Sequence, residues 1–139
     1  MPSWYGQTTF VDGLAQETCR DFTHESHGLA GLINGAETAL NQGLDLYGEQ
    51  ATRLTKTMEF HAKYQNGAAV PSWLCGGSLN LMTGSGLTYE IAYNHFHNRK
   101  GVSLPETLKM LQAARPLGTG AHKNWETLTH YGVGSVGLP

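Results

Sequence analysis

The sequence predicts an all-α fold, in which four main helices pack as two antiparallel hairpins. Apolar residues recur at intervals of three and four in four separate segments, which is the spacing of a buried helix face. Stretches with the alternation of a strand are few. The connections 43–48 and 101–103 are short, and short connections bring consecutive helices together antiparallel. A central sheet of three or more strands would contradict this prediction.

Size and charge limit the classes of protein that the chain resembles. With 139 residues it is expected to form one domain, 1–139, with an extended lead-in over 1–16. The net charge is -2 and only 14% of residues are charged, so no basic surface indicates nucleic-acid binding and no polybasic patch indicates a membrane surface. No apolar run reaches the roughly 20 residues of a membrane span. The first residues lack a signal-peptide pattern, which favours a cytoplasmic protein or a mature chain.

The first helix is predicted over about 18–42, and Gly43 ends it. Gly28, Gly31 and Gly35 lie on one side of this helix. Each costs about 1 kcal/mol relative to alanine in a helix interior, so we expect another backbone or a ligand to approach there closely. The apolar stripe of this helix consists of Leu29, Leu32, Ile33, Ala36 and Leu40. The polar residues Arg20, His24 and His27 extend the glycine side toward the start of the helix.

The second helix is predicted over about 49–64, ending at Asn66 and Gly67. Its inward residues are Ala51, Leu54, Met58 and Ala62. His61 lies near the inner edge and is interpreted as a hydrogen-bonded core histidine. Residues 67–86 form a long loop with two short strand-like pieces, 70–75 and 78–82, and loops of this length are often functional.

The third helix, about 88–99, combines an apolar stripe with hydrogen-bonding side chains. Tyr89, Ala92, Tyr93 and Phe96 form the stripe, and Glu90, Asn94 and His97 share a neighbouring face. His95 and Arg99 are one turn apart, so an imidazole and a cation can converge on one anionic substrate. The alternative is a partly buried helix whose polar groups satisfy one another.

The fourth helix, 104–114, carries a capping-box pattern in which Ser103 caps and Glu106 completes the box. Leu104, Leu108, Leu111 and Ala114 form its stripe, and Arg115 and Pro116 end it. Residues 117–139 are expected to be an extended tail, with 125–131 laid over the helices as an extended segment. The two cysteines, Cys19 and Cys75, form no CxxC motif, and either one disulfide or two buried thiols fits the sequence.

Five separated blocks of the chain resemble the alginate-lyase domain family. They are QETCRDFTH at 16–24, AETA with QGLDLY at 36–47, YEIAYNH with NRKG at 89–101, RP at 115–116 and WETLTH at 125–130. The resemblance covers roughly 12–131 and implies an α/α toroid-like arrangement of helix pairs around a cleft for an acidic polysaccharide. Such toroids have about twice this length, so the chain resembles the later part of one. The resemblance also implies secretion.

A uronate lyase of this kind removes the proton beside a carboxylate, which requires donors for the carboxylate, a base and an acid. Asn94 and Arg20 are the candidate carboxylate donors, His24 or His95 the candidate base, and Tyr93 the candidate acid. Each has a structural alternative: Asn94 as a cap or bridge, and Tyr93 as a core residue. The candidate sugar-binding residues are Arg99, Trp73, Trp125, His97 and His130. No cofactor is expected.

Two further functions remain open. The first is a non-catalytic carbohydrate-binding or structural remnant of a lyase, which fits the short chain. The second is a metal site, with imidazoles from His24 and His27 or from His95 and His97, and a carboxylate from Asp21 or Glu25. Neither histidine pair has the four-residue spacing that chelates best from one helix, so we assign no residue as a metal ligand. Half a toroid exposes apolar surface, so we expect a twofold homodimer with the glycine side or the region of Trp125 in the contact.

Overall fold

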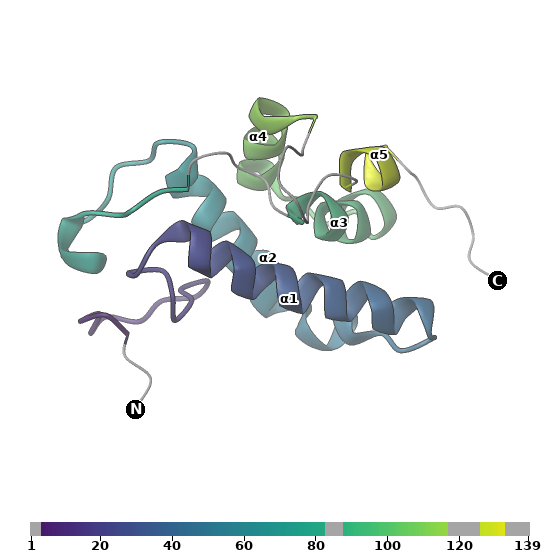
Figure 1. Ribbon diagram of the computed structural model, residues 1–139, viewed down its shortest axis with the longest axis horizontal. Helices are drawn as coiled ribbons and strands as arrows, with labels where there is room; N and C mark the ends of the chain where they lie inside the picture. The colour runs from purple at the N-terminus through teal and green to yellow at the C-terminus, as the bar shows by residue number, and fades with distance from the viewer. Residues whose placement is uncertain (1–3, 83–87, 117–125, 133–139) are drawn as a thin grey trace.

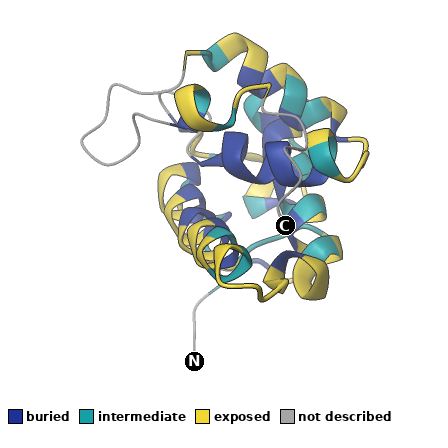
Figure 2. Cartoon of the chain, turned by 90° about the vertical axis from the view of Figure 1, so that its right-hand side faces the viewer, coloured by how far each residue is buried: buried dark blue, intermediate teal, exposed yellow. Residues whose placement is uncertain are grey.

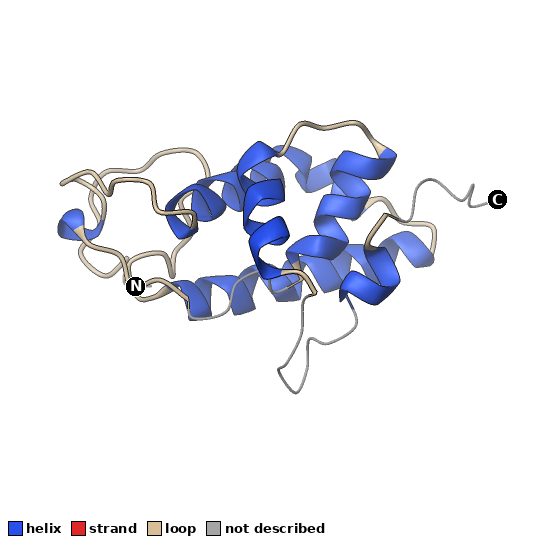
Figure 3. Ribbon diagram, turned by 90° about the horizontal axis from the view of Figure 1, so that it is seen from above, coloured by secondary structure: helices blue, strands red, loops and turns tan. Residues whose placement is uncertain are grey.

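The computed structural model describes residues 4–82, 88–116 and 126–132, and within these ranges it contains helices, turns and loops without any strand (Figure 3). The prediction of an all-α fold is confirmed. The helices are α1 (Phe22–Asn41), α2 (Leu46–Gln65), α3 (Tyr89–Tyr93), α4 (Pro105–Ala114) and α5 (Glu126–His130), with a 3-10 turn η1 (Cys75–Gly77) and a π-helical segment η2 (Asn94–Arg99). Among the described helices, none combines the length and the apolar character of a membrane span.

The helices form two hairpins that pack on each other. In Figure 1, α1 and α2 lie side by side, and α3, α4 and α5 lie together on one side of them. α4 packs mainly on α2, and α3 packs on α1. α3 is buried along its whole length and is dark blue in Figure 2. The main core joins both hairpins through Ile33, Tyr47, Met58, Ala62, Ala92, Phe96 and Leu111.

The start of each long helix is set by an aspartate. α1 begins at Phe22 because Asp21 accepts a hydrogen bond from the backbone N–H of His24 at 2.8 Å. α2 begins at Leu46, three residues before the predicted start, because Asp45 accepts from the N–H of Gly48 at 2.8 Å. This earlier start places Tyr47 in the first turn of α2, where its side chain is fully buried.

The capping-box prediction for α4 is wrong, because a side chain from another helix caps this helix. The carboxylate of Glu59, on α2, accepts from the backbone N–H groups of Glu106 and Thr107 at 3.1 and 2.8 Å. The carboxylate of Glu106 accepts instead from Asn66 at the end of α2, at 2.8 Å. The residue at the N-cap is Leu104, without a side-chain hydrogen bond. The cap therefore also fixes α4 against α2.

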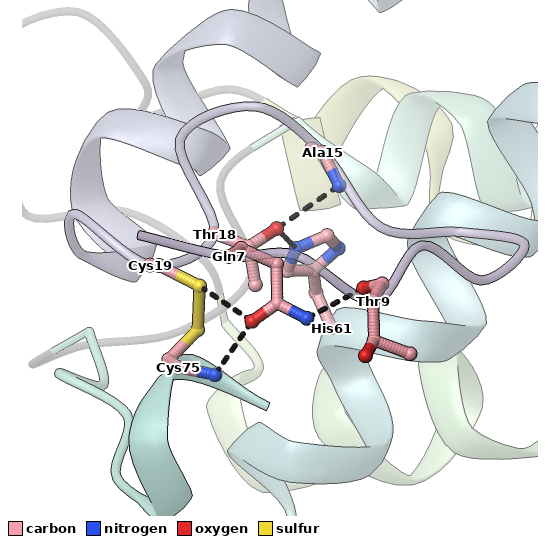
Figure 4. Close-up of a disulfide and its surroundings, with 7 residues drawn as sticks. All are labelled: Gln7, Thr9, Ala15, Thr18, Cys19, His61 and Cys75. Carbon is pink, nitrogen blue, oxygen red and sulfur yellow. Dashed lines mark hydrogen bonds between the residues drawn. A yellow bond between two sulfur atoms is a disulfide. The ribbon is translucent and has the colours of Figure 1, made fainter. Parts of the chain in front are cut away.

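A disulfide between Cys19 and Cys75 connects the residues before α1 to η1 (Figure 4). Gln7 lies beside it: its side-chain oxygen accepts from the N–H of Cys75 at 2.8 Å, and the Cys19 sulfur, which carries no proton, lies 3.6 Å from that oxygen. A disulfide that closes a long loop contributes about 2–4 kcal/mol to stability. Of the two alternatives for the cysteines, the structure has the bonded one.

His61 is the core histidine that its position predicts. Its Nδ1–H donates to the carbonyl of Thr57 at 2.8 Å, and its Nε2 lies 2.9 Å from the hydroxyl of Thr18, which then donates to it (Figure 4). The same hydroxyl oxygen accepts from the N–H of Ala15 at 3.0 Å. Thr18 is therefore a turn residue that packs on α2, rather than the first residue of α1.

Three further predictions are corrected. The strand-like pieces 70–75 and 78–82 form loop and the turn η1, since no partner strand lies beside them in the described chain. The segment 125–131 was expected to be extended, yet Glu126–His130 form α5, which packs on α3. The third helix is α-helical only to Tyr93 and continues as η2. The rest of the predicted tail lies outside the described residues.

Candidate functional site

The π-helical segment η2 coincides with the block of polar residues that sequence analysis selected. One extra residue per turn rotates the side chains that follow, and π segments are frequent at functional sites. Asn94 is fully buried and His95 is 4% exposed, both at the junction of α1, α2 and α5. The segment thus directs an amide and an imidazole into the interior, where an ordinary surface helix would present them to water.

His95 and Tyr47 form the centre of a polar cluster. Their rings stack with centroids 4.0 Å apart and planes 15° from parallel. The Tyr47 hydroxyl donates to Glu37 Oε2 at 3.1 Å, and His130 Nε2 lies 3.7 Å from Glu37 Oε1. We refer to this set as the Tyr47–His95 cluster, with the members Glu37, Tyr47, Asn94, His95, Arg99 and His130.

Asn94 attaches α5 to this cluster. Its side-chain Nδ2 donates to the carbonyl oxygen of His130 at 2.9 Å, and that carbonyl is the last of α5. The orphan carbonyls at a helix end need such a donor. Asn94 therefore holds the backbone of His130 over the cluster, and the side chains of His130 and Glu37, 18% and 17% exposed, form its rim toward solvent.

Three titratable side chains of the cluster have shifted pKa values. The nearby His130 ring and the hydrogen bond from Tyr47 lower the pKa of Glu37 below its ordinary value, against the effect of burial. Burial, together with Glu37, raises the pKa of Tyr47. Burial, followed by the charge of Lys100, lowers the pKa of His95. Near neutral pH the cluster thus contains a carboxylate, a protonated phenol and a neutral imidazole.

One ring nitrogen and one guanidinium in the described part of the cluster remain for a ligand or a reaction. His95 Nδ1 is buried and has no hydrogen-bond partner among the residues that the structure describes. Arg99 is half-buried and lies near enough to influence the pKa values of Glu37 and Tyr47. A neutral imidazole with an unpaired nitrogen can accept a proton, and a guanidinium can bind a carboxylate in a bidentate geometry.

Tyr93 and His97 belong to a different group of side chains. Their rings stack on each other with centroids 4.7 Å apart, and His97 Nδ1 donates to the carbonyl of Val102 at 2.8 Å. The guanidinium of Arg115 lies 6.0 Å from the Tyr93 ring and binds both carboxylate oxygens of Glu90, at 2.8 and 2.7 Å. The structure therefore separates Tyr93 from His95, although the two are adjacent in sequence.

Arg20 and His24 are also separate from the Tyr47–His95 cluster. His24 Nδ1 lies 2.6 Å from Asp21 at the start of α1, and Arg20 pairs with Glu17 at 3.4 Å. Glu37 follows His24 by thirteen positions in α1, which corresponds to about 20 Å along the helix axis. Of the tryptophans, Trp73 is 39% exposed in the loop before η1, and Trp125 lies outside the described residues.

The histidine pairs that were weighed as metal ligands do not form a metal site in the described part of the chain. No group of three or more His, Cys, Asp and Glu side chains there has the geometry to hold an ion. His27 Nδ1 donates to the carbonyl of Thr23 in its own helix, at 2.6 Å, while His24 turns to Asp21. His95 and His97 contact different aromatic rings, Tyr47 and Tyr93.

Sequence reasoning missed Glu37 and Tyr47. Both lie in the blocks that resemble the alginate-lyase domain family, at 36–39 and 42–47, yet neither received a role. Tyr47 fell in the predicted connection between helices, and only the earlier start of α2 makes it a core residue. The comparisons with known proteins add no assignment: no family model, curated protein or solved structure matches the chain significantly.

Proposed function

We propose that this chain is a polysaccharide lyase-like protein that cleaves a uronate-containing acidic polysaccharide by β-elimination at the Tyr47–His95 cluster. One observation carries the proposal: an imidazole, a phenol and a nearby guanidinium come together from α2 and η2. A uronate lyase needs a base, an acid and a cation in this combination. The resemblance of the sequence blocks supports the same class of reaction.

The groups of the cluster suggest a division of roles. His95, a neutral imidazole, takes the proton from the carbon beside the uronate carboxylate. The electron pair of that C–H bond forms the new double bond as the glycosidic C–O bond breaks, and Tyr47 protonates the departing oxygen. Arg99 neutralises the substrate carboxylate, so that negative charge can develop beside it. Glu37 and Asn94 are positioning residues: Glu37 orients the Tyr47 hydroxyl, and Asn94 holds the backbone of α5.

The Cys19–Cys75 disulfide supports an extracellular location for such an activity, because disulfides persist in oxidising compartments. A secreted lyase would meet acidic polysaccharides of the extracellular space directly.

A substrate panel tests the proposal. Alginate, polyglucuronate and a glycosaminoglycan are incubated with the wild type across a range of pH, and the absorbance of the unsaturated uronate product is followed. We expect product from at least one substrate and a loss of about 10²-fold or more in His95→Ala, the scale of general-base catalysis. The rate should rise with pH below 6.5, since the pKa of His95 is lowered from that value. His27→Ala changes an exposed side chain on α1 whose Nδ1 donates to the Thr23 carbonyl of the same helix, so this matched control should keep its rate.

If no substrate gives product, or if His95→Ala keeps full activity, the lyase proposal is wrong. The burial of Asn94 and His95, 0% and 4% exposed, favours one second candidate, a non-catalytic carbohydrate-binding or structural remnant. In that case the same polysaccharides retard the protein in affinity electrophoresis without releasing unsaturated product.

A further inference from the structure

A groove with a volume of ≈ 690 Å³ lies between α1 and α2, outside the Tyr47–His95 cluster. Its α1 wall contains Gly28, Gly31 and Gly35, and its α2 wall contains Leu46 and Leu54. Ligand sites typically have volumes of roughly 300–1,000 Å³ and mostly apolar walls with a few polar groups. The groove has the volume and the mostly apolar lining of such a ligand site.

The three glycines give the groove its shape, and no neighbour in the described chain requires them. A Cβ added at Gly28, Gly31 or Gly35 would meet no atom within 4 Å. Each glycine nevertheless costs the helix about 1 kcal/mol relative to alanine. The close approach that sequence analysis expected on this side does not come from the described residues, and the space beside the glycines is open. An occupant from outside these residues would explain the glycines.

A buried carboxyl group at Glu25 forms part of the groove lining and is the second, independent feature. Glu25 is 3% exposed, and its Oε1 has no hydrogen-bond partner in the described chain. His61 Nδ1 lies 3.4 Å from it, but this nitrogen donates to the Thr57 carbonyl at 2.8 Å. Although 3.4 Å would permit an ion pair, burial raises the pKa of Glu25 to about 8 and lowers the pKa of His61 to about 4, which favours the neutral forms of both.

The other titratable groups around Glu25 do not compensate a charge on it. Tyr89 faces it from α3, and its pKa is raised by burial and by Glu25. Glu17 lines the groove before α1 and is already paired with Arg20 at 3.4 Å. Arg53 lies on the exposed α2 side of the groove and forms no hydrogen bond or ion pair with Glu25. A cation for Glu25 would have to come with a ligand.

We propose that the groove binds a primary amine with an apolar body, whose ammonium group hydrogen-bonds to Glu25 and whose hydrocarbon part lies along the glycine wall. Hydrogen bonds between an ammonium and a carboxylate are among the strong ones in proteins. An alkylamine has an ordinary pKa of about 10, close to that of lysine. It therefore arrives charged at pH 7, and Glu25, which is mostly protonated there, releases its proton to the solvent as the ion pair forms.

Calorimetric titration with three ligands of equal chain length tests the charge preference. Octylammonium, 1-octanol and octanoate are titrated at pH 7 in two buffers that differ in ionisation enthalpy. We expect octylammonium to bind at least 10-fold more tightly than 1-octanol, with release of close to one proton, and octanoate to bind most weakly. Equal binding of octylammonium and 1-octanol, or octylammonium binding without proton release, would overturn the proposal.

Two variants distinguish the contribution of the Glu25 carboxyl group to binding from that of the apolar groove. Glu25→Gln keeps the shape, so it should lose both the proton release and the preference for octylammonium while it still binds 1-octanol. Gly31→Leu fills the groove and should abolish the binding of octylammonium and of 1-octanol. The control Lys63→Gln, an exposed change near the end of α2, should leave the binding of both ligands unchanged. Proton release that persists in Glu25→Gln would contradict the assignment. Helix content from circular dichroism shows that each variant is folded.

A measurement on the wild type keeps the test independent of folding defects. Carboxyl-carbon nuclear magnetic resonance follows the titration of Glu25, whose pKa should fall when octylammonium is added. An unchanged pKa would overturn the proposal. If octylammonium fails to bind and the chain sediments as a dimer that Gly31→Leu dissociates, the groove is an interface between copies and the amine site falls. None of these outcomes depends on lyase activity.

Discussion

Glu25 and Glu37 lie on the same helix, about three turns apart, and their pKa values are shifted in opposite directions although burial alone would raise both. Around Glu37, the ring of His130 at 3.7 Å and a hydrogen bond from the hydroxyl of Tyr47 lower its pKa. Around Glu25, no such donor is present in the described chain, and burial raises the pKa to about 8. The donors that a carboxyl group meets, rather than burial alone, thus decide its charge.

Glu90 extends the comparison to a fully buried carboxylate with its own cation. Arg115 binds both of its oxygens, so the charge is compensated within the protein. The three glutamates therefore differ in the groups that contact their carboxyl oxygens. Glu90 has a guanidinium, Glu37 has a phenol hydroxyl and an imidazole ring, and Glu25 has no donor from the described chain. Substitutions at these glutamates, their partners and the groove wall are given below in order of the expected effect, from the largest to the smallest.

Arg115→Ala should have the largest effect on stability. It leaves the Glu90 carboxylate, which is fully buried, without a partner, and loss of one member of a buried ion pair costs about 3–5 kcal/mol. The free energy of unfolding in urea measures the loss. Lys109→Ala, an exposed change on α4, is the control and should remain within about 0.5 kcal/mol of the wild type. Similar values for the two variants would mean that the ion pair contributes little.

Glu25→Gln should change how stability depends on pH. The pKa of Glu25 rises from 4.5 to about 8 on folding, so its contribution to stability is complete below pH 4.5 and is lost as pH rises to 8. The pKa of His61 falls from 6.5 to about 4, so its contribution is complete above pH 6.5 and is lost as pH falls to 4. Because the two contributions change in opposite directions, the stability of the wild type should stay level between pH 4.5 and 6.5 and should fall from pH 6.5 to 8.

In Glu25→Gln only the histidine contribution remains. Stability should then rise from pH 4 to 6.5 and stay level to pH 8, with a difference in slope from the wild type of about 1.4 kcal/mol per pH unit. Urea unfolding at half-unit intervals of pH measures both curves. Parallel curves for the wild type and Glu25→Gln would show that Glu25 is ionised in the folded protein.

Tyr47→Phe and Tyr93→Phe compare the two phenols on either side of η2. Tyr47→Phe removes a hydrogen bond to Glu37, and it should lower lyase turnover by about 10²-fold and stability by about 1 kcal/mol. Tyr93→Phe keeps the stacking on His97 and should leave turnover nearly unchanged. The same substrate assay measures both variants. A greater loss in Tyr93→Phe would transfer the acid role back to the residue that the sequence suggested.

Gly31→Ala should have the smallest effect, and the effect should be favourable. The added Cβ meets open space, so the helix gains about 0.5–1 kcal/mol. Gly13→Ala is the opposite case, because its φ is +90° and a Cβ would lie 2.5 Å from the carbonyl oxygen of Lys56. Thermal unfolding distinguishes a raised from a lowered Tm. A destabilised Gly31→Ala would mean that the groove wall is already in contact with something.

The fold was predictable because its signals are local. Apolar periodicity located all four main helices, and Gly43 and Gly67, both with positive φ, ended the first two helices near the predicted positions. Errors arose where distant residues decide the structure. Glu59 caps α4 from another helix, which no pattern around Ser103 can reveal. α5 forms against α3, although its residues alternate like a strand.

The members of the Tyr47–His95 cluster that lie in one segment could be grouped from the sequence, because their signal is also local. Asn94, His95 and Arg99 are near in sequence, so one segment indicated them together. Their partners Tyr47 and Glu37 come from other helices, and the π-helical turn that separates His95 from Tyr93 leaves no mark that we recognised in the sequence. That Glu25 Oε1 has no hydrogen-bond partner in the described chain was equally hidden, since it depends on where His61 directs its Nδ1 proton.

The disulfide described above has a topological consequence. The covalent loop from Cys19 to Cys75 contains the whole of α1 and α2, as well as the exposed turn between them, where Leu44 is 62% exposed. Exposed loop tips are preferred sites of proteolysis. A chain cut at this turn would still be one molecule, because the two fragments remain joined through sulfur. The cut would become visible on a gel only after reduction, and the groove between the two helices would keep both of its walls.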